Sequence, residues 1–83
     1  MLLYEDTKLK KYKSNLKRQR ISKGLTQEGL AELANVNIKS IASYEQNPQK
    51  LTSASAGTVY KLADALGCDI EDILNNETIK DEE

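Results

Sequence analysis

Apolar residues recur along most of the chain at the spacing of amphipathic helices, and no segment shows the alternation typical of a β-strand. Each such helix would bury one apolar face against its neighbours. Residues that favour helix starts and ends set the limits of these segments. The pattern therefore predicts an all-α fold with five helices, near residues 8–23, 27–34, 38–46, 56–66 and 70–75.

The first of these helices has two candidate starts, since Thr7 and Ser14 can each cap a helix N-terminus with a hydroxyl. Leu9 and Leu16 would lie on its apolar face. Gly24 follows it and readily adopts the left-handed conformation at which helices end. We expect this helix to run to about residue 23.

Residues 26–46 predict two short helices joined by a tight turn. Thr26 is a good N-cap for the first of them. Asn35 tolerates the left-handed backbone that ends a helix, and Asn37 can cap the next one. The second helix would bury Ile41 and leave most of its other side chains facing outward.

The remaining apolar positions complete a single core. Residues 47–55 include the only Pro of the chain and are expected to form its longest irregular segment. Asp69 would cap a last short helix. The predicted core draws on every helix and comprises Leu16, Leu30, Leu33, Val36, Ile41, Tyr44, Val59, Leu62, Leu66, Ile70 and Ile73.

The 83 residues of the chain are enough for one small core, which supplies only a few kcal/mol of stability. We expect residues 1–7 to form a flexible arm and residues 8–75 to form the folded domain. Residues 76–83 are polar and acidic and have little to bury, which predicts a disordered tail.

The two central helices and their flanks resemble the helix-turn-helix of the Cro/lambda-repressor (XRE-like) family of DNA-binding regulators. The resemblance spans about residues 14–75. It rests on small Ala31, where two helices must approach closely, and on flanking segments at matching spacing. Two departures stand out, since the family usually has Gly in place of Asn35 and of Asn47–Pro48. The usually apolar positions of the motif are Leu30, Ala34, Val36, Ile41 and Tyr44.

The resemblance implies a DNA interface built on the second helix of the motif. Lys39 could donate to guanine, Ser43 could meet a base edge, and Ile38 could contact a thymine methyl group. Plain N-capping is the alternative role for Thr26, and support of the first helical turn is the alternative for Ser40. Solvent exposure is the alternative for Gln27, Lys17, Gln46 and Lys50. The expected phosphate contacts are Thr26, Gln27, Ser40, Lys17, Gln46 and Lys50.

Arg20 and Glu45 match a pair of residues that family members use as an internal ion pair. Such a pair would tie the first helix to the end of the recognition helix and orient it. The alternative is that Arg20 is free to meet a DNA phosphate.

The net charge of −1 is unevenly distributed along the chain. Residues 1–50 carry ten Lys or Arg and five Asp or Glu, whereas residues 51–83 carry two and eight. Because a local field steers a polyanion, the basic half that holds the motif is compatible with DNA binding. Lys8, Lys10, Lys11 and Lys13 could equally be a solvated face.

Several functional classes find little support in the composition. The chain has no His and a single Cys, Cys68, so neither a zinc site nor an internal disulfide is expected. We expect no enzyme activity, cofactor, metal or small-molecule ligand. The acidic residues Asp69, Glu71 and Asp72 are explained by capping at a helix start. No apolar run is long enough to span a membrane and no secretory signal is visible, so we expect a cytoplasmic protein.

The combined expectation is a sequence-specific regulator of transcription, a repressor that binds an operator as a homodimer. One alternative is an antitoxin-like protein that binds DNA and also a partner toxin. Another is a helical protein-interaction module that does not bind DNA. Salt-dependent binding to duplex DNA would separate this last alternative from the other two.

Overall fold

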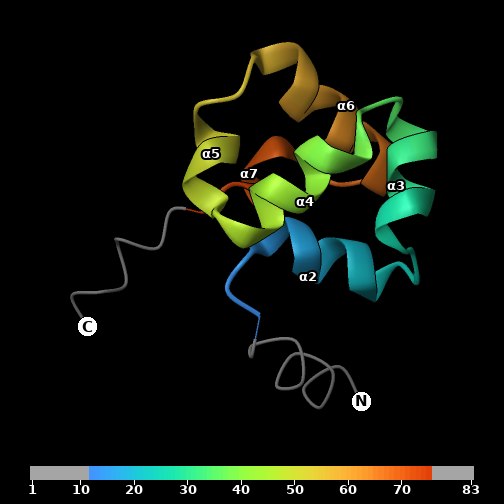
Figure 1. Ribbon diagram of the computed structural model, residues 1–83. Coiled ribbons are helices and arrows are strands. Elements are labelled where there is room, and N and C mark those ends of the chain that lie inside the picture. Colours follow the sequence, from blue (N-terminus) through green and yellow to red (C-terminus); the bar gives the residue numbers. More distant parts are fainter. Residues whose placement is uncertain (1–11, 76–83) are drawn as a thin grey trace.

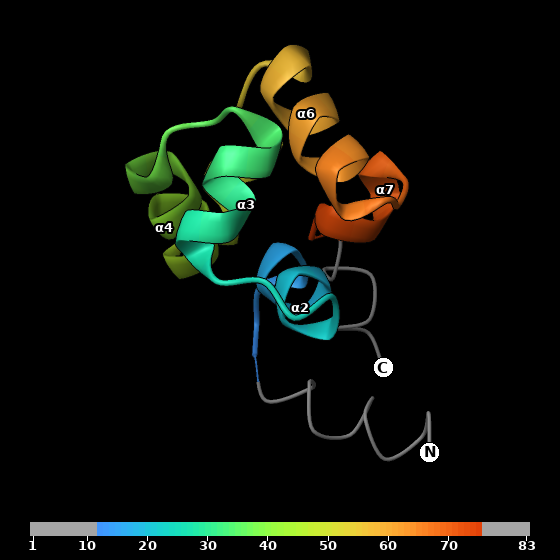
Figure 2. The same cartoon turned by 90° about the vertical axis from the view of Figure 1, so that its right-hand side faces the viewer.

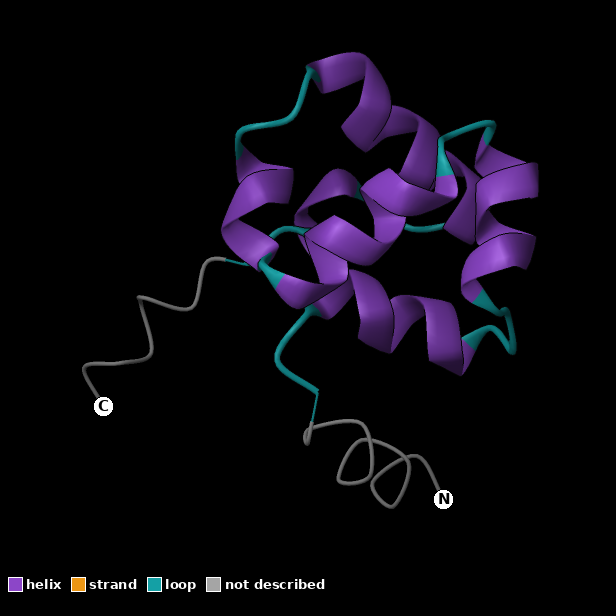
Figure 3. Cartoon of the chain, viewed as in Figure 1, coloured by secondary structure: helices purple, strands orange, loops and turns teal. Residues whose placement is uncertain are grey.

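The computed structural model describes residues 12–75, and helices account for most of them (Figures 1 and 3). No strand occurs within this range. The predicted all-α fold is confirmed, and residues 12–75 alone contain six helices where five were predicted for the chain. In chain order the helices are α2 (Asn15–Ser22), α3 (Gln27–Ala34), α4 (Ile38–Gln46), α5 (Pro48–Thr52), α6 (Ala56–Leu66) and α7 (Ile70–Ile73).

The helices surround one core. Helix α3 packs against both α4 and α6, while α2 contacts α4 and α7. Helix α6 also packs against α7, and α5 packs against α4. Figure 2 shows α4 and α7 at opposite sides of the domain, with α3 and α6 between them and α2 below. Helix α4 and the last helix, α7, therefore lie on different sides of the domain.

The N-caps of α3 and α4, and the turn that joins these helices, form as the side chains predict. Thr26 Oγ1 accepts a hydrogen bond from the amide of Gly29 at 2.9 Å and caps α3. Asn35 ends α3 in the left-handed conformation, with φ of 58°. Asn37 Oδ1 then accepts from the amide of Lys39 at 2.7 Å and caps α4. Local chemistry is enough to define this turn because each bond spans only a few residues.

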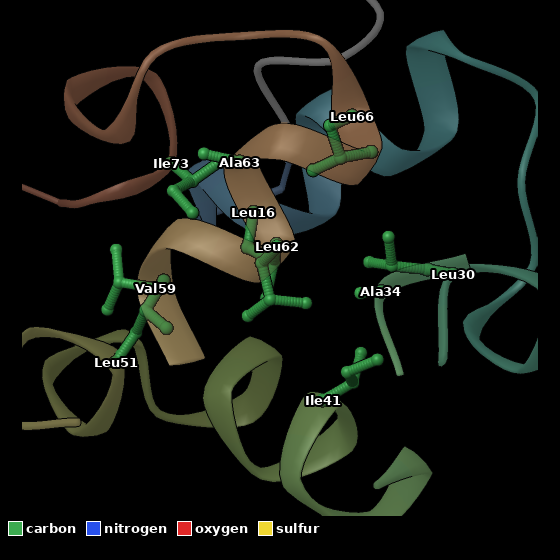
Figure 4. Close-up of a cluster of buried hydrophobic side chains, with 10 residues drawn as sticks. All are labelled: Leu16, Leu30, Ala34, Ile41, Leu51, Val59, Leu62, Ala63, Leu66 and Ile73. Carbon is green, nitrogen blue, oxygen red and sulfur yellow. The ribbon is translucent and has the colours of Figure 1, made fainter. Parts of the chain in front are cut away.

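The buried core differs from the predicted one at several positions (Figure 4). Leu33 is 61% exposed and Ile70 is 38% exposed, so the prediction that these two residues belong to the core was wrong. Leu33 lies on an outward face of α3, and Ile70 is only partly covered by its neighbours. Val36 and Tyr44 are only partly buried and pack against the edge of the core. The buried side chains are Leu16, Leu30, Ala34, Ile41, Leu51, Val59, Leu62, Ala63, Leu66 and Ile73.

The irregular segment expected at residues 47–55 contains a helix, α5. Pro48 is its first residue, a position where the missing N–H costs nothing and the fixed φ suits a helix. Leu51 of α5 is 2% exposed and joins the core. Burial of this one leucine holds a five-residue helix that is too short to be stable alone.

The first described helix is shorter than the predicted 8–23. It begins at Asn15, because Ser14 has an extended backbone and its hydroxyl accepts from the amide of Lys17. Arg18 Nε also donates to the carbonyl of Tyr12 at 2.7 Å, which holds the chain just before the cap. Of the two candidate caps, Ser14 is the one used at the start of α2. The proposed arm at residues 1–7 lies outside the described residues.

The last helix also ends earlier than predicted, at Ile73, because Leu74 has an extended backbone. Asn75 then binds the start of α2. Its Oδ1 accepts from the amide of Asn15 at 2.9 Å, and its Nδ2 donates to the carbonyl of Lys13 at 2.8 Å. The chain thus leaves α7 against the beginning of α2. The proposed acidic tail, residues 76–83, lies outside the described residues.

Candidate nucleic-acid interface

Helix α4 presents one strip of side chains on its outward side, which we call the α4 face: Ile38, Lys39, Ser43 and Gln46. Ile38 is 41% exposed, and Lys39 is exposed beside it. Ser43 lies one turn after Lys39 and is partly exposed. Ile41 on the opposite side is completely buried, so the rotation of α4 about its axis is fixed by the core. The three proposed base contacts therefore share one outward-facing surface.

The N-terminus of α3 supplies Thr26 and Gln27. Thr26 is exposed, and its hydroxyl oxygen already accepts from Gly29. A hydroxyl is donor and acceptor at once, so the O–H of Thr26 remains available to a phosphate oxygen. The tight packing of this cap explains the glycine, because a Cβ at Gly29 would lie 3.3 Å from Thr26 Oγ1.

Arg20 and Glu45 meet in a bidentate ion pair. Arg20 Nε lies 2.7 Å from Glu45 Oε2, and its Nη2 lies 3.0 Å from Oε1. The two side chains are only 10% and 4% exposed. Buried charges persist only when they are paired and hydrogen-bonded, as these are. The guanidinium of Arg20 therefore faces inward and is not a free group for DNA.

Two further bonds extend this pair into a network, which we call the Arg20 network. Arg20 Nη1 donates to the carbonyl of Leu25 at 2.8 Å, in the loop before α3. Gln27 Nε2 donates to Glu45 Oε1 at 3.0 Å. The network thus joins the end of α2, the start of α3 and the last turn of α4. It fixes the position of α4 relative to the N-terminus of α3.

The bond to Glu45 also determines which way the Gln27 amide points. An ionised carboxylate can only accept, so the amide nitrogen must be the end that faces Glu45. The second N–H and the carbonyl oxygen of the amide form no hydrogen bond with the described residues. Gln27 can therefore stay bound to Glu45 and still donate to a phosphate outside the protein.

The other phosphate candidates are spread more widely around α4. Lys17 lies one turn before Arg20 on α2, and its ammonium is 4.6 Å from the centre of the Tyr12 ring. Ser40 is partly exposed in the first turn of α4. Gln46 and Lys50 are exposed, at the end of α4 and on α5. Only Gln46 belongs to the α4 face itself.

Two features of this region were missed by the sequence prediction. The hydrogen bond from Gln27 to Glu45 was one, because Gln27 was assigned only to phosphate. The bond from Arg20 to the Leu25 carbonyl was the other. Both depend on how α2, α3 and α4 are placed in space. The pairing of Arg20 with Glu45 was the available signal, since a buried carboxylate has more acceptor sites than one guanidinium fills.

The described residues contain no group of His, Cys, Asp and Glu side chains that could hold a metal ion. Within the same residues, no helix has the length and apolar character needed to cross a membrane. Cys68 is partly buried between α6 and α7. Burial raises the pKa of its thiol, and the Asp72 and Asp69 carboxylates act in the same direction, whereas Lys23 opposes them. A thiol with a raised pKa is a weak nucleophile at neutral pH.

A family model described as helix-turn-helix, of the XRE/Cro-lambda-repressor type, matches residues 16–73. Neither a curated protein nor a solved structure matches the chain. The matched residues run from α2 to the end of α7 and include both helices of the motif. The chain therefore belongs to this helix-turn-helix family of DNA-binding regulators, which is not an enzyme family.

Proposed function

We propose that this DNA-binding regulator is a sequence-specific repressor that binds its operator as a homodimer, with α4 in the major groove. The observation that carries the proposal is the α4 face, where Ile38, Lys39 and Ser43 point outward from a helix held by the Arg20 network. A major groove admits one α-helix, and a helix must be held rigidly to read base edges.

Each residue of the α4 face has a distinct proposed contact. Lys39 donates to the O6 and N7 of guanine, and Ser43 hydrogen-bonds to a base edge. Ile38 packs against the methyl group of a thymine, which gives an exposed isoleucine a role. These contacts carry the sequence information.

A second set of residues holds the protein on the DNA backbone. Thr26 and Gln27 contact a phosphate beside the start of α3, where the helix dipole also favours an anion. Ser40, Lys17, Gln46 and Lys50 are further proposed phosphate contacts. Arg20 and Glu45 touch no DNA and orient α4 through their ion pair. Phosphate contacts fix the register of the protein but carry no sequence information themselves.

We propose a homodimer because one recognition helix reads too few base pairs to select a site. Two-fold symmetry would place the two α4 helices on half-sites about 34 Å apart, one helical turn of DNA. A dimer bound over a promoter would exclude the transcription machinery and repress.

Selection of bound duplexes from a random pool tests the proposal. We expect the winning sequences to show two-fold symmetry, with half-sites about one turn apart. Binding of a winner should weaken steeply as salt rises, because Lys contacts release counterions. A chain that enriches no sequence, or that enriches only asymmetric single sites, would contradict the proposed homodimeric operator binding.

A reporter placed behind the selected site then tests the direction of regulation. Repression should follow expression of the protein and disappear when Lys39 is replaced by Ala. Increased transcription from the same reporter would show an activator in place of a repressor.

A further inference from the structure

A groove of about 400 Å³ lies between α6 and α7, and α7 lies across the domain from α4 (Figure 2). We call it the α6–α7 groove. Its apolar lining comes from Tyr60 and Ala63 of α6, from Cys68 in the connecting turn, and from Ile70 of α7. Tyr60 is 60% exposed and Ile70 is 38% exposed, two of the four large apolar side chains that the described surface exposes.

The rest of the lining is acidic. Asp64, Asp69 and Glu71 border the groove, and no Lys or Arg is among its lining residues. None of the three carboxylates forms an ion pair with any residue in the described range 12–75. Lys23 and Asp72, whose charges act on Cys68, already have hydrogen-bond partners. Lys23 donates to the carbonyl of Leu66, and the Asp72 carboxylate accepts from the amide of Asp69.

We propose that the α6–α7 groove is a docking site for a basic amphipathic segment of a partner protein. The segment inserts an apolar side chain between Tyr60 and Ile70 and places Lys or Arg residues against Asp64, Asp69 and Glu71. Apolar anchors in a groove supply most of the binding energy of such contacts, while complementary rim charges select the partner.

Charge decides between the candidate occupants. A second copy of this chain docked by two-fold symmetry would bring the same surface against itself. Six carboxylates would then gather at one contact, and their repulsion opposes it. DNA is excluded for the same reason, because its phosphates carry the charge of the rim. A basic amphipathic segment matches both parts of the groove, because its apolar side chains meet the apolar lining and its Lys or Arg residues meet the carboxylates.

The position of the groove lets such a partner act on the DNA-bound protein. Helix α4 packs against α2, α3 and α5, whereas the groove is formed by α6 and α7 on the opposite side (Figure 2). A segment in the groove would therefore leave the α4 face free. The inference does not depend on the proposed repressor function, since peptide binding is measured without DNA.

The test uses the full chain and a synthetic helical peptide of Leu, Ala and Lys, with Leu on one face. In ¹H–¹⁵N spectra, we expect the peptide to shift amides of the groove residues and to leave those of α4 unchanged. Cys68, the single cysteine, reports on the same site. Its alkylation by iodoacetamide should slow severalfold when the peptide is bound. A matched peptide with Glu in place of every Lys should produce neither effect.

Variants then separate the two parts of the proposal. Asp64→Asn combined with Glu71→Gln should weaken peptide binding by roughly three- to tenfold, because exposed ion pairs are individually weak. Ile70→Ala should weaken it by about tenfold, through loss of the apolar anchor. Glu28→Gln combined with Glu32→Gln removes the same charge from exposed positions on α3, and should change binding less than twofold.

Several outcomes would overturn the inference. Equal binding of the Lys and Glu peptides would show that the rim does not select charge. Peptide shifts at α4 in place of the groove would place the site elsewhere. Concentration-dependent dimerisation that Ile70→Ala abolishes would make the groove a contact between copies. Peptide binding strengthened several-fold by replacing Lys8, Lys10 and Lys11 with Gln would make the chain's own N-terminal segment the occupant.

Discussion

We propose two contact surfaces on this small domain, the α4 face and the α6–α7 groove, and they differ in charge and in support. The α4 face has one cation, Lys39, among neutral side chains, whereas the groove is bordered by three carboxylates. Behind α4 lies the buried Arg20 network, with bonds to three segments of the chain. The groove depends on a four-residue helix whose anchor is Ile73.

The two proposed contacts need different support from the same core. A surface that reads DNA needs a fixed geometry, because a small displacement misplaces every hydrogen bond to a base. An apolar groove tolerates more adjustment, since apolar contact has no preferred direction. The polar network therefore lies behind the surface that needs precision.

The largest effect is expected from breaking the Arg20 network. Arg20→Ala or Glu45→Ala should each lower the free energy of unfolding by about 3–5 kcal/mol, because either leaves a buried charge without its partner. Denaturant melts of both single variants and of the double variant measure the coupling. The double variant should lose much less than the sum of the two. Strictly additive losses would show that the pair contributes no interaction energy.

On the groove side, two isoleucines of the same short helix form a matched pair. Ile73 is completely buried, so Ile73→Ala should cost about 2–5 kcal/mol of unfolding free energy. Ile70 is 38% exposed, and Ile70→Ala should cost well under half as much. Thermal melts of the two variants provide the comparison. Equal losses would mean that Ile70 is part of the core and not of a docking surface.

DNA binding separates residues that read bases from residues that hold the backbone. Lys39→Ala should cost about 1–3 kcal/mol on the selected operator and flatten the preference at one base pair of each half-site. Gln27→Ala should weaken selected and scrambled duplexes by similar factors, with little change in salt dependence because Gln is neutral. Titrations of both variants against both duplexes at several salt concentrations measure this. If Lys39→Ala weakens all duplexes equally, Lys39 contacts phosphate, and Ile38 and Ser43 become the base readers.

The smallest effect concerns the chemistry of Cys68 in the groove. Burial and the Asp72 carboxylate raise the pKa of its thiol, so little thiolate is present at neutral pH. Asp72→Asn removes the charge but keeps an oxygen that can accept from the Asp69 amide. The pKa should fall and alkylation by iodoacetamide should become faster at neutral pH. Lys23→Met removes the opposing charge and should slow the reaction. A faster reaction in both variants would indicate that loosening of the local structure, and not charge, controls the reactivity of the Cys68 thiol.

Much of the fold could be predicted from the sequence because its determinants are local. The caps at Thr26 and Asn37 and the left-handed Asn35 each act within a few residues. The spacing of Leu30, Ile41 and Leu62 likewise placed them in the core, where all three are completely buried. Helical periodicity and capping chemistry are properties of the chain itself, and no contact between distant segments is needed to recognise them.

Burial at the edges of the pattern depends on how the helices pack together. Leu33 and Ile70 fit the apolar spacing but are left exposed, while Leu51 in an expected loop became a core residue. Periodicity shows which residues share a face, but not whether another helix packs on that face.

The polar contacts also divide into those that the sequence indicated and those that depend on the packing of distant segments. The sequence alone indicated that Arg20 and Glu45 could pair, through resemblance to a family. Only the structure joined Gln27 to the same carboxylate, and bound Asn75 to the start of α2. Gln27 lies 18 residues from Glu45, and Asn75 lies 60 residues from Asn15. Local spacing cannot predict such contacts, because the packing of the whole core places their atoms within hydrogen-bonding distance.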